Sequence, residues 1–253
     1  MTARRMSRGP LARAGGDVRN RRMRAVFATC AVVVALVSVN IATHWTGGAL
    51  WFGPVVAVAL VAFARRTGLS WSQLGLGADR LRSGTLWGLG AITVVASIYL
   101  VGVLVPMTRL AFLDARYHLD APGAMRSALI VIPLGTVLIE EIAFRSVLWG
   151  MLARHSTTSW VLVVTSVLFG LWHILPSLHL ASANRAVGDA VGGVGTAATI
   201  LVVVATVIFT GVGGLVAGEL RRRSGSVLAS VGMHWATNAL GVLFGLIAWR
   251  LAA

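Results

Sequence analysis

The 253-residue sequence contains no lysine, a single cysteine and only three glutamates. One cysteine, Cys30, excludes an intrachain disulfide and a cluster of thiolate metal ligands. Charged residues make up only 12% of the chain and hydrophobic residues make up 57%, which excludes an ordinary water-soluble domain. Membrane lipid is therefore the expected solvent and the first expected partner of this chain.

The net charge of +14 comes from arginine alone. These arginines flank apolar runs and do not form a basic groove with interleaved aromatic residues, so no nucleic-acid partner is expected. Residues 1–24 hold eight arginines among small residues and show no apolar periodicity, which predicts a disordered basic cytoplasmic arm. A secretory signal is the alternative, but the apolar run from Ala25 is long and leads directly to another span.

Residues 25–253 are predicted to be a transmembrane bundle, an all-α polytopic fold of about seven spans. A span needs about 20 apolar helical residues. The expected spans are 25–43, 48–64, 84–106, 126–151, 159–176, 196–218 and 226–250, of which the second is short and the fifth contains Pro176. In the sixth, Gly211, Gly214 and Gly218 permit close helix approach.

The arginine distribution predicts a cytoplasmic N-terminus. The connections that would then face inward hold Arg65, Arg66, Arg80, Arg82, Arg154, Arg221, Arg222 and Arg223. The outward connections hold fewer arginines, so the positive-inside rule is satisfied. Residues 67–83 place Trp71 and several leucines among polar residues, which is typical of an interfacial amphipathic stretch instead of a span.

Two of the three glutamates, Glu140 and Glu141, are adjacent within the fourth apolar run. A carboxylate at membrane depth costs roughly 2.5 to 3.5 kcal/mol on insertion scales, so such a pair indicates function. Arg145 follows Glu141 by one helical turn, and an ion pair between them would explain one carboxylate as structural. It does not explain both.

Two histidines within spans are the natural partners of this pair. His173 ends the run that begins at Phe169, and His234 precedes Asn238 by four residues, which places both on one helix face. At about 1.5 Å per residue, Glu141, His173 and His234 fall in one layer of the membrane, so three helices could converge there. Trp172 and Trp235 adjoin the histidines and are expected mainly to pack, with lining of the cleft as the alternative.

These side chains supply two kinds of chemistry. A carboxylate in a low-dielectric site can take a proton from water while imidazoles and an amide stabilise an oxyanion, as peptide hydrolysis requires. Alternatively, Glu140, His173 and His234 form a His₂Glu set for a divalent metal such as zinc, with a fourth position for water. The H-E-x-x-H signature is absent, so both mechanisms stay open.

Three ordered motifs resemble the CPBP group of intramembrane proteases, which includes type II prenyl-protein (CAAX) endopeptidases, Abi proteins and bacteriocin-immunity proteins. They are E-E-x-x-x-R at Glu140–Arg145, F-x-x-x-H at Phe169–His173 and H-x-x-x-N at His234–Asn238, and the resemblance covers about 125–245. It implies that Glu140 activates water together with His173, that His234 and Asn238 bind the oxyanion, and that Glu141, Arg145 and Phe169 are supporting. The family has been described both as metalloproteases and as metal-independent glutamate enzymes.

The expected function is therefore an intramembrane endopeptidase acting on a membrane-associated peptide or protein in a prokaryotic plasma membrane. A non-catalytic scaffold or immunity protein of the same fold is the first alternative. An ion-coupled transporter is the second, because intramembrane carboxylates also mark ion paths. No internal repeat supports it.

Overall fold

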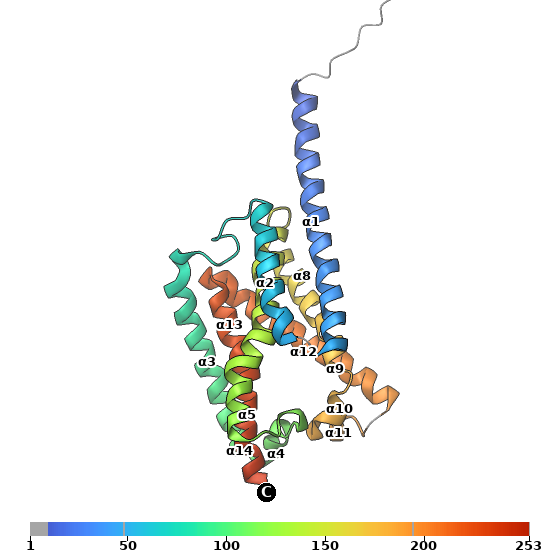
Figure 1. The fold of residues 1–253 in the computed structure, drawn as a ribbon, viewed down its shortest axis with the longest axis vertical. Helices are drawn as coiled ribbons and strands as arrows, with labels where there is room; N and C mark the ends of the chain where they lie inside the picture. Colours follow the sequence, from blue (N-terminus) through green and yellow to red (C-terminus); the bar gives the residue numbers. More distant parts are fainter. Residues whose placement is uncertain (1–9, 48, 194, 253) are drawn as a thin grey trace, which may run out of the picture.

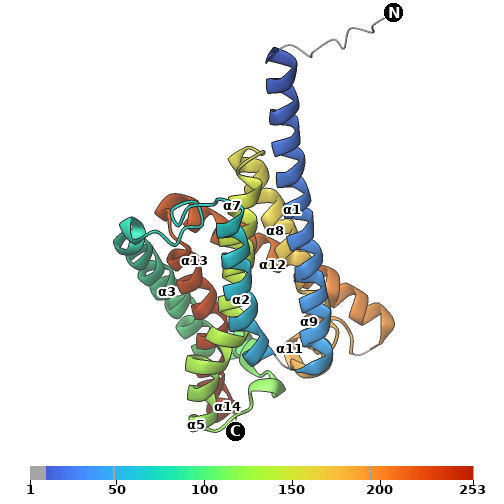
Figure 2. The same cartoon turned by 45° about the horizontal axis from the view of Figure 1, so that its top comes forward.

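The computed structural model describes residues 10–47, 49–193 and 195–252. The described part of the chain is helical and contains no β-strand, only an isolated bridge between Asp114 and Asn184. The prediction of an all-α membrane bundle is confirmed. Figures 1 and 2 show helices packed side by side, with α1 standing at one edge and extending well beyond the rest.

The long helices are α1 (Pro10–Thr46), α2 (Ala49–Arg66), α3 (Leu81–Leu104), α8 (Thr158–Trp172), α12 (Thr196–Ser224), α13 (Val227–Trp235) and α14 (Gly241–Ala252). Short elements in the connections are η1 (Ala78–Arg80), α4 (Pro106–Arg109), η2 (Leu110–Phe112), η3 (Ala115–Tyr117), α9 (Ile174–Ser177), α10 (Leu180–Ala183) and α11 (Arg185–Ala190).

One further helix, residues 121–152, is interrupted by π-helical turns, and we call it the site helix. It comprises α5 (Ala121–Arg126), η4 (Ser127–Val131), η5 (Pro133–Val137), α6 (Leu138–Glu141), η6 (Ile142–Leu148) and α7 (Trp149–Leu152). Pro133 lacks a backbone N–H and so favours an irregular hydrogen-bond ladder here. A similar π-helical turn, η7 (Ala236–Leu240), joins α13 to α14. Such turns often occur at functional sites.

Five helical stretches among the described residues are long and apolar enough to cross a membrane: Met23–Thr46, Ala78–Leu104, Ala121–Leu152, Thr196–Ser224 and Val227–Ala252. They correspond to five of the seven predicted spans. The other two are α2 and α8, which are shorter. Helix α8 ends at Trp172, shortly before Pro176, and the short helix α9 begins at Ile174. The count of seven stays a prediction.

The N-terminal arm differs from expectation over residues 10–24. Helix α1 begins at Pro10, so the helix starts about four turns before the predicted span. Arginine and alanine are good helix formers, and an apolar helix that follows lets them add turns without a new nucleation step. Residues 1–9 of the predicted disordered arm lie outside the described residues.

The site helix is the buried centre of the bundle. Of its most apolar window 61% is buried, against 11–33% for the other four candidate spans. Around it, α12 packs against α8 and α13 against α3. The glycines predicted to permit close approach do so, since the Cα of Gly211 lies against Gly170 and a Cβ at Gly214 would contact Ser166.

The segment between α2 and α3 is not a span, in agreement with the sequence. Its turns place Leu69 and Leu74 in the protein core, fully buried, while Trp71 is half exposed beneath the guanidinium of Arg65. This segment therefore covers one end of the bundle and contacts α7 through Gly150.

Candidate active site

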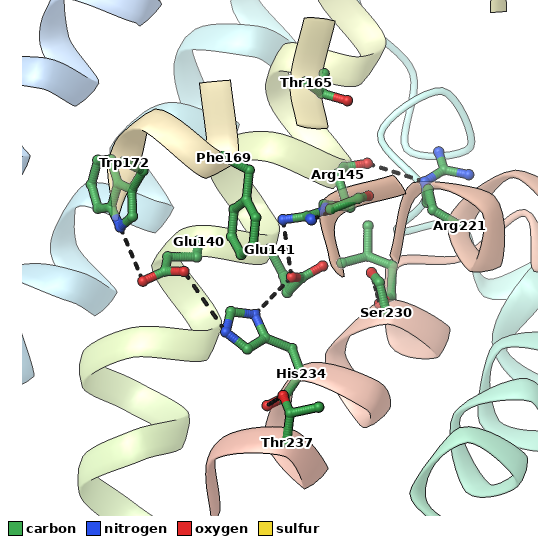
Figure 3. A network of polar contacts seen from close by, with 12 residues as sticks. Glu140, Glu141, Arg145, Thr165, Phe169, Trp172, Arg221, Ser230, His234 and Thr237 are labelled. Carbon is green, nitrogen blue, oxygen red and sulfur yellow. Dashed lines mark hydrogen bonds and ion pairs between the residues drawn. The ribbon is translucent and has the colours of Figure 1, made fainter. Parts of the chain in front are cut away.

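Glu140 and Glu141 lie on the single α-helical turn α6, between two π-helical stretches of the site helix. Both are buried: Glu140 is 5% exposed and Glu141 is fully enclosed. As Figure 3 shows, both carboxylates approach the imidazole of His234, while Trp172 contacts only Glu140 and Arg145 contacts only Glu141. The two carboxylates therefore share one histidine and differ in their second partner.

The carboxylate of Glu141 contacts one histidine and one arginine. His234 Nδ1 lies 2.8 Å from Glu141 Oε1, and Arg145 Nη1 lies 3.3 Å from the same oxygen. The guanidinium of Arg145 is 1% exposed and also donates to the carbonyl of Gly214 on α12 at 3.4 Å. The predicted Glu141–Arg145 ion pair is therefore present.

Glu140 faces both histidines. Its Oε1 accepts a hydrogen bond from Trp172 Nε1 at 3.0 Å. Its Oε2 lies 3.8 Å from His173 Nε2 and 3.7 Å from His234 Nε2, and this oxygen is buried without a hydrogen-bond partner. Burying a carboxylate oxygen without a hydrogen bond costs free energy. A hydrogen-bond donor is therefore expected in the space between these three atoms.

The partners of the two Nδ1 atoms fix the orientation of both imidazoles. His173 Nδ1 lies 2.8 Å from the carbonyl of Phe169, which can only accept, so Nδ1 carries the hydrogen. The Glu141 carboxylate likewise makes His234 Nδ1 the donor. The Nε2 atoms of both rings are consequently left free to face Glu140.

Phe169 is the packing centre of the site. Its ring contacts the imidazoles of His173 and His234 edge-on, with centroids 4.8 and 5.7 Å apart, and lies 3.9 Å from the guanidinium carbon of Arg145. One aromatic ring therefore positions both histidines and stacks on the cation behind them.

Glu140 and His173 line a cavity of about 450 Å³, and Asn238 on η7 lines the same cavity. Its wall is rich in polar groups, among them Asn40, Thr43, Thr136, Ser177 and Thr206. A cavity of this size and polarity can hold an extended peptide segment and water beside Glu140. The predicted convergence of three helices is therefore present, with His234 behind Glu140.

The arrangement can be compared with the requirements of a metal. Ligands about 2.0 to 2.2 Å from a tetrahedral zinc lie roughly 3.3 to 3.5 Å from one another. The Glu140 oxygen is 3.7 and 3.8 Å from the two histidine nitrogens, and no group of three His, Cys, Asp or Glu residues in the described chain has metal-site geometry. As they stand the three residues do not fit a metal, and the predicted metal set stays a prediction.

Three residues take part that sequence reasoning did not assign to the site. Trp172, which was expected mainly to pack, donates a hydrogen bond to Glu140. Trp235 instead donates to the carbonyl of Ala128 and takes no part in the site. Asn40 on α1 donates to the carbonyl of Trp172 at 2.9 Å. Arg221, predicted to lie in an inner loop, is 6% exposed and donates to the carbonyl of Arg145 at 3.2 Å. Only Trp172 had a sequence signal, its position beside His173.

The length and apolarity of these helices define an integral membrane protein. The buried Glu–His centre at the end of a polar cavity is typical of a hydrolase. Residues 122–240 match the family described as Type II CAAX prenyl endopeptidase Rce1-like. This stretch, slightly less than half of the chain, resembles that protease family, and it contains Glu140, Glu141, His173, His234 and Asn238. No match was found among curated proteins or among solved structures.

Proposed function

We propose that the chain is an intramembrane endopeptidase in which Glu140 activates a water molecule for attack on a peptide bond. The observation that carries the proposal is the unpaired Glu140 Oε2, which faces two imidazole nitrogens at the end of the cavity. The match of residues 122–240 to a protease family supports it.

In the first step, water beside Glu140 attacks the carbonyl carbon of the scissile bond and gives its proton to Glu140 Oε2. His173 donates its Nδ1–H to the Phe169 carbonyl, so its Nε2 is free to accept a hydrogen bond from the second hydrogen of the same water, which stays on the attacking oxygen. Glu140 Oε2 is buried and has no hydrogen-bond partner, so it is free to accept that proton directly.

The attack leaves a tetrahedral oxyanion that requires donors. Asn238 supplies an amide N–H₂ from the cavity wall, and His234 supplies Nε2–H when its ring is protonated. The Glu141 carboxylate accepts from His234 Nδ1 at 2.8 Å and so holds the ring with Nε2 toward Glu140. Protonated Glu140 then returns its proton to the amide nitrogen as the C–N bond breaks, so every proton is accounted for.

Arg145 and Phe169 act through other residues in this mechanism. Arg145 compensates the buried charge of Glu141, and Phe169 fixes the planes of both imidazoles. Neither reaches the cavity. The metal-dependent mechanism remains the alternative, with Glu140, His173 and His234 as the ligands, and a chelator distinguishes the two.

The substrate class follows from the surroundings of the site. The centre lies between helices that are apolar outside and polar around the cavity, so the substrate is a peptide or protein held at the membrane. An ion path is less compatible with the geometry, because the fully buried Glu141 and Arg145 close the cavity behind Glu140.

The test is cleavage of a membrane-anchored fluorogenic peptide library by the purified protein in detergent. Wild type should cleave a subset of the library, and His173→Ala should abolish that cleavage while leaving the thermal unfolding transition in place. Absence of cleavage by folded wild-type protein would favour the non-catalytic scaffold.

A further inference from the structure

Trp172 and His173, which both face Glu140, are joined by one peptide bond at a break between two helices. Helix α8 ends at Trp172 and α9 begins at Ile174, and His173 between them has φ −86° and ψ 3°. Trp172 Nε1 donates to one oxygen of Glu140 at 3.0 Å, and His173 Nε2 lies 3.8 Å from the other. The orientation of this single peptide unit therefore sets the direction of both side chains toward Glu140.

Pro176 leaves the carbonyl of Trp172 without the donor that a regular helix would supply. In an α-helix each carbonyl accepts from the N–H four residues later, and the residue four positions after Trp172 is a proline, which has no N–H. The next carbonyl, that of His173, does receive such a bond, from the Ser177 N–H at 3.2 Å. Leaving a carbonyl unpaired inside an apolar bundle is costly, so another donor is needed.

Asn40 supplies that donor from a distant part of the chain. Its Nδ2 donates to the Trp172 carbonyl at 2.9 Å, although 132 positions separate the two residues. On the other side of the same peptide unit, the N–H of His173 donates to the carbonyl of Gly170 at 3.0 Å. Both polar groups of the Trp172–His173 peptide are therefore held, one by α8 itself and one by α1.

The packed face of α1 brings Asn40 to this carbonyl. Val32 and Leu36 are each 3% exposed and belong to the same buried cluster as Phe169. Asn40 follows Leu36 by four residues, so it lies on that face one turn further along, where α1 runs beside α9 in Figures 1 and 2. An amide on an otherwise apolar face is costly without a hydrogen bond, and the bond to α8 accounts for it.

From these contacts we propose that Asn40 is a positioning residue of the site. Through the Trp172 carbonyl it fixes the peptide unit whose two side chains face Glu140. Asn40 lies on α1, outside the stretch 122–240 that resembles the protease family, so the site is complete only with a helix from beyond that stretch. The effect on turnover rests on the proposed function, whereas the hydrogen bond itself does not.

The turnover of Asn40→Leu tests the positioning role. Leucine has about the same size and suits an apolar helix, but its side chain donates no hydrogen bond. On a peptide that wild-type protein cleaves, kcat should fall by about 10- to 10²-fold with KM nearly unchanged, because a misplacement of about 1 Å can cost 10²-fold. Asn40→Gln retains an amide donor and should recover part of that loss.

The matched control is Thr29→Val, on the same face of α1 about three turns before Asn40. Thr29 is buried, and its hydroxyl donates to the carbonyl of Ala25 within the same helix. Thr29→Val should therefore keep the wild-type kcat. A rise in KM at constant kcat for Asn40→Leu would assign Asn40 to substrate binding instead. A wild-type kcat for Asn40→Leu, or equal losses for Asn40→Leu and Asn40→Gln, would overturn the positioning role.

A double-mutant cycle with Pro176→Ala tests the origin of the bond and needs no activity. Alanine restores a backbone N–H four residues after Trp172, so the carbonyl gains a second donor. Asn40→Leu should therefore lower the melting temperature in detergent less in the Pro176→Ala background than in the wild-type background. Equal decreases in both backgrounds would contradict the replacement of the missing N–H by Asn40. Lack of cleavage by folded wild-type protein would count against the peptidase function, while the cycle would still decide the bond.

Discussion

His234 donates a hydrogen bond to Glu141 at 2.8 Å, although the two residues are 93 positions apart in the sequence. The bond joins α13 to the site helix at the depth of the catalytic layer. It fixes which imidazole nitrogen faces Glu140, and it gives the second glutamate a purpose distinct from that of the first. Glu141 therefore organises the site that Glu140 uses.

Replacing Glu141 by glutamine should destabilise the protein strongly. The substitution leaves the guanidinium of Arg145, which is 1% exposed, without a countercharge. Breaking a buried pair on one side costs about 3 to 5 kcal/mol. The melting temperature in detergent should fall well below that of wild type.

The matched control is Glu219→Gln, which removes the third glutamate from exposed ion pairs with Arg222 and Arg223. It should leave the melting temperature nearly unchanged, because exposed pairs contribute little. The double variant Glu141→Leu with Arg145→Met should lose less stability than Glu141→Gln, since no unpaired charge stays buried. A double variant that is less stable than the single one would contradict this account of the pair.

Truncating Phe169 to alanine should reduce both stability and turnover. The ring is 6% exposed and contacts both site imidazoles and the Arg145 guanidinium. Phe→Ala in a core costs about 3 to 5 kcal/mol, and the loosened histidines should lower kcat. Phe169→Leu keeps most of the volume, so it should recover stability more than turnover. Equal recovery of both would show that the ring only fills space.

Asn238→Ala should lower kcat by about 10²- to 10³-fold, the effect of losing one oxyanion donor, with little change in KM. An oxyanion donor acts mainly in the transition state, so the ground-state complex is spared. Asn238 lines the cavity beside Glu140, where such an oxyanion would form. Steady-state kinetics on one defined peptide would measure the split, and a rise in KM at constant kcat would instead assign Asn238 to substrate binding.

Arg221 should stabilise the site from the side of segment 67–77. Its guanidinium donates to Arg145 and Gln73 carbonyls, and hydrogen bonds from charged groups contribute about 1.5 to 3 kcal/mol. Arg221→Met should lower the free energy of unfolding by that order. Gly75→Ala should act similarly, because its methyl would overlap the same guanidinium.

The control for Gly75→Ala is Gly68→Ala in the same segment. Both glycines have positive φ, +72° and +89°, so both substitutions strain the backbone, but a Cβ at Gly68 meets only Arg154 Nη2 at 3.7 Å. Chemical denaturation should therefore rank Gly75→Ala as the less stable variant. Equal stabilities would show that the Arg221 contact contributes nothing.

Metal removal separates the two mechanisms. If Glu140 and His173 activate water directly, exhaustive dialysis against a chelator should leave the cleavage rate unchanged. The same protein should hold far less than one equivalent of transition metal by elemental analysis. Loss of activity on chelation, restored by adding back one equivalent of zinc, would establish the metal mechanism with Glu140, His173 and His234 as ligands.

Much of the site could be predicted from the sequence, because polar residues are rare in apolar helices and each one requires an explanation. Glu140, Glu141, His173 and His234 stand out for this reason, and their common depth predicted the convergence that the structure contains. The spacing of Arg145 from Glu141 likewise predicted their ion pair.

The remaining features depend on tertiary contacts that spacing does not encode. Arg221 follows an apolar helix next to two exposed arginines, and only the fold of segment 67–77 over it makes it a buried donor. The lining of the cavity likewise depends on where the short connections η3 and α10 lie. The early start of α1 reflects helix propagation into a charged segment, which composition alone read as disorder.

The most direct test of the proposed mechanism is the turnover of Glu140→Gln on a peptide that wild-type protein cleaves in detergent, with Glu219→Gln as the control. Removing the general base should lower kcat by about 10²- to 10⁴-fold, while the isosteric amide retains the hydrogen bond from Trp172 and a normal melting temperature, and Glu219→Gln should match wild type. A folded Glu140→Gln protein that cleaves at the wild-type rate would contradict the assignment of Glu140 as the base.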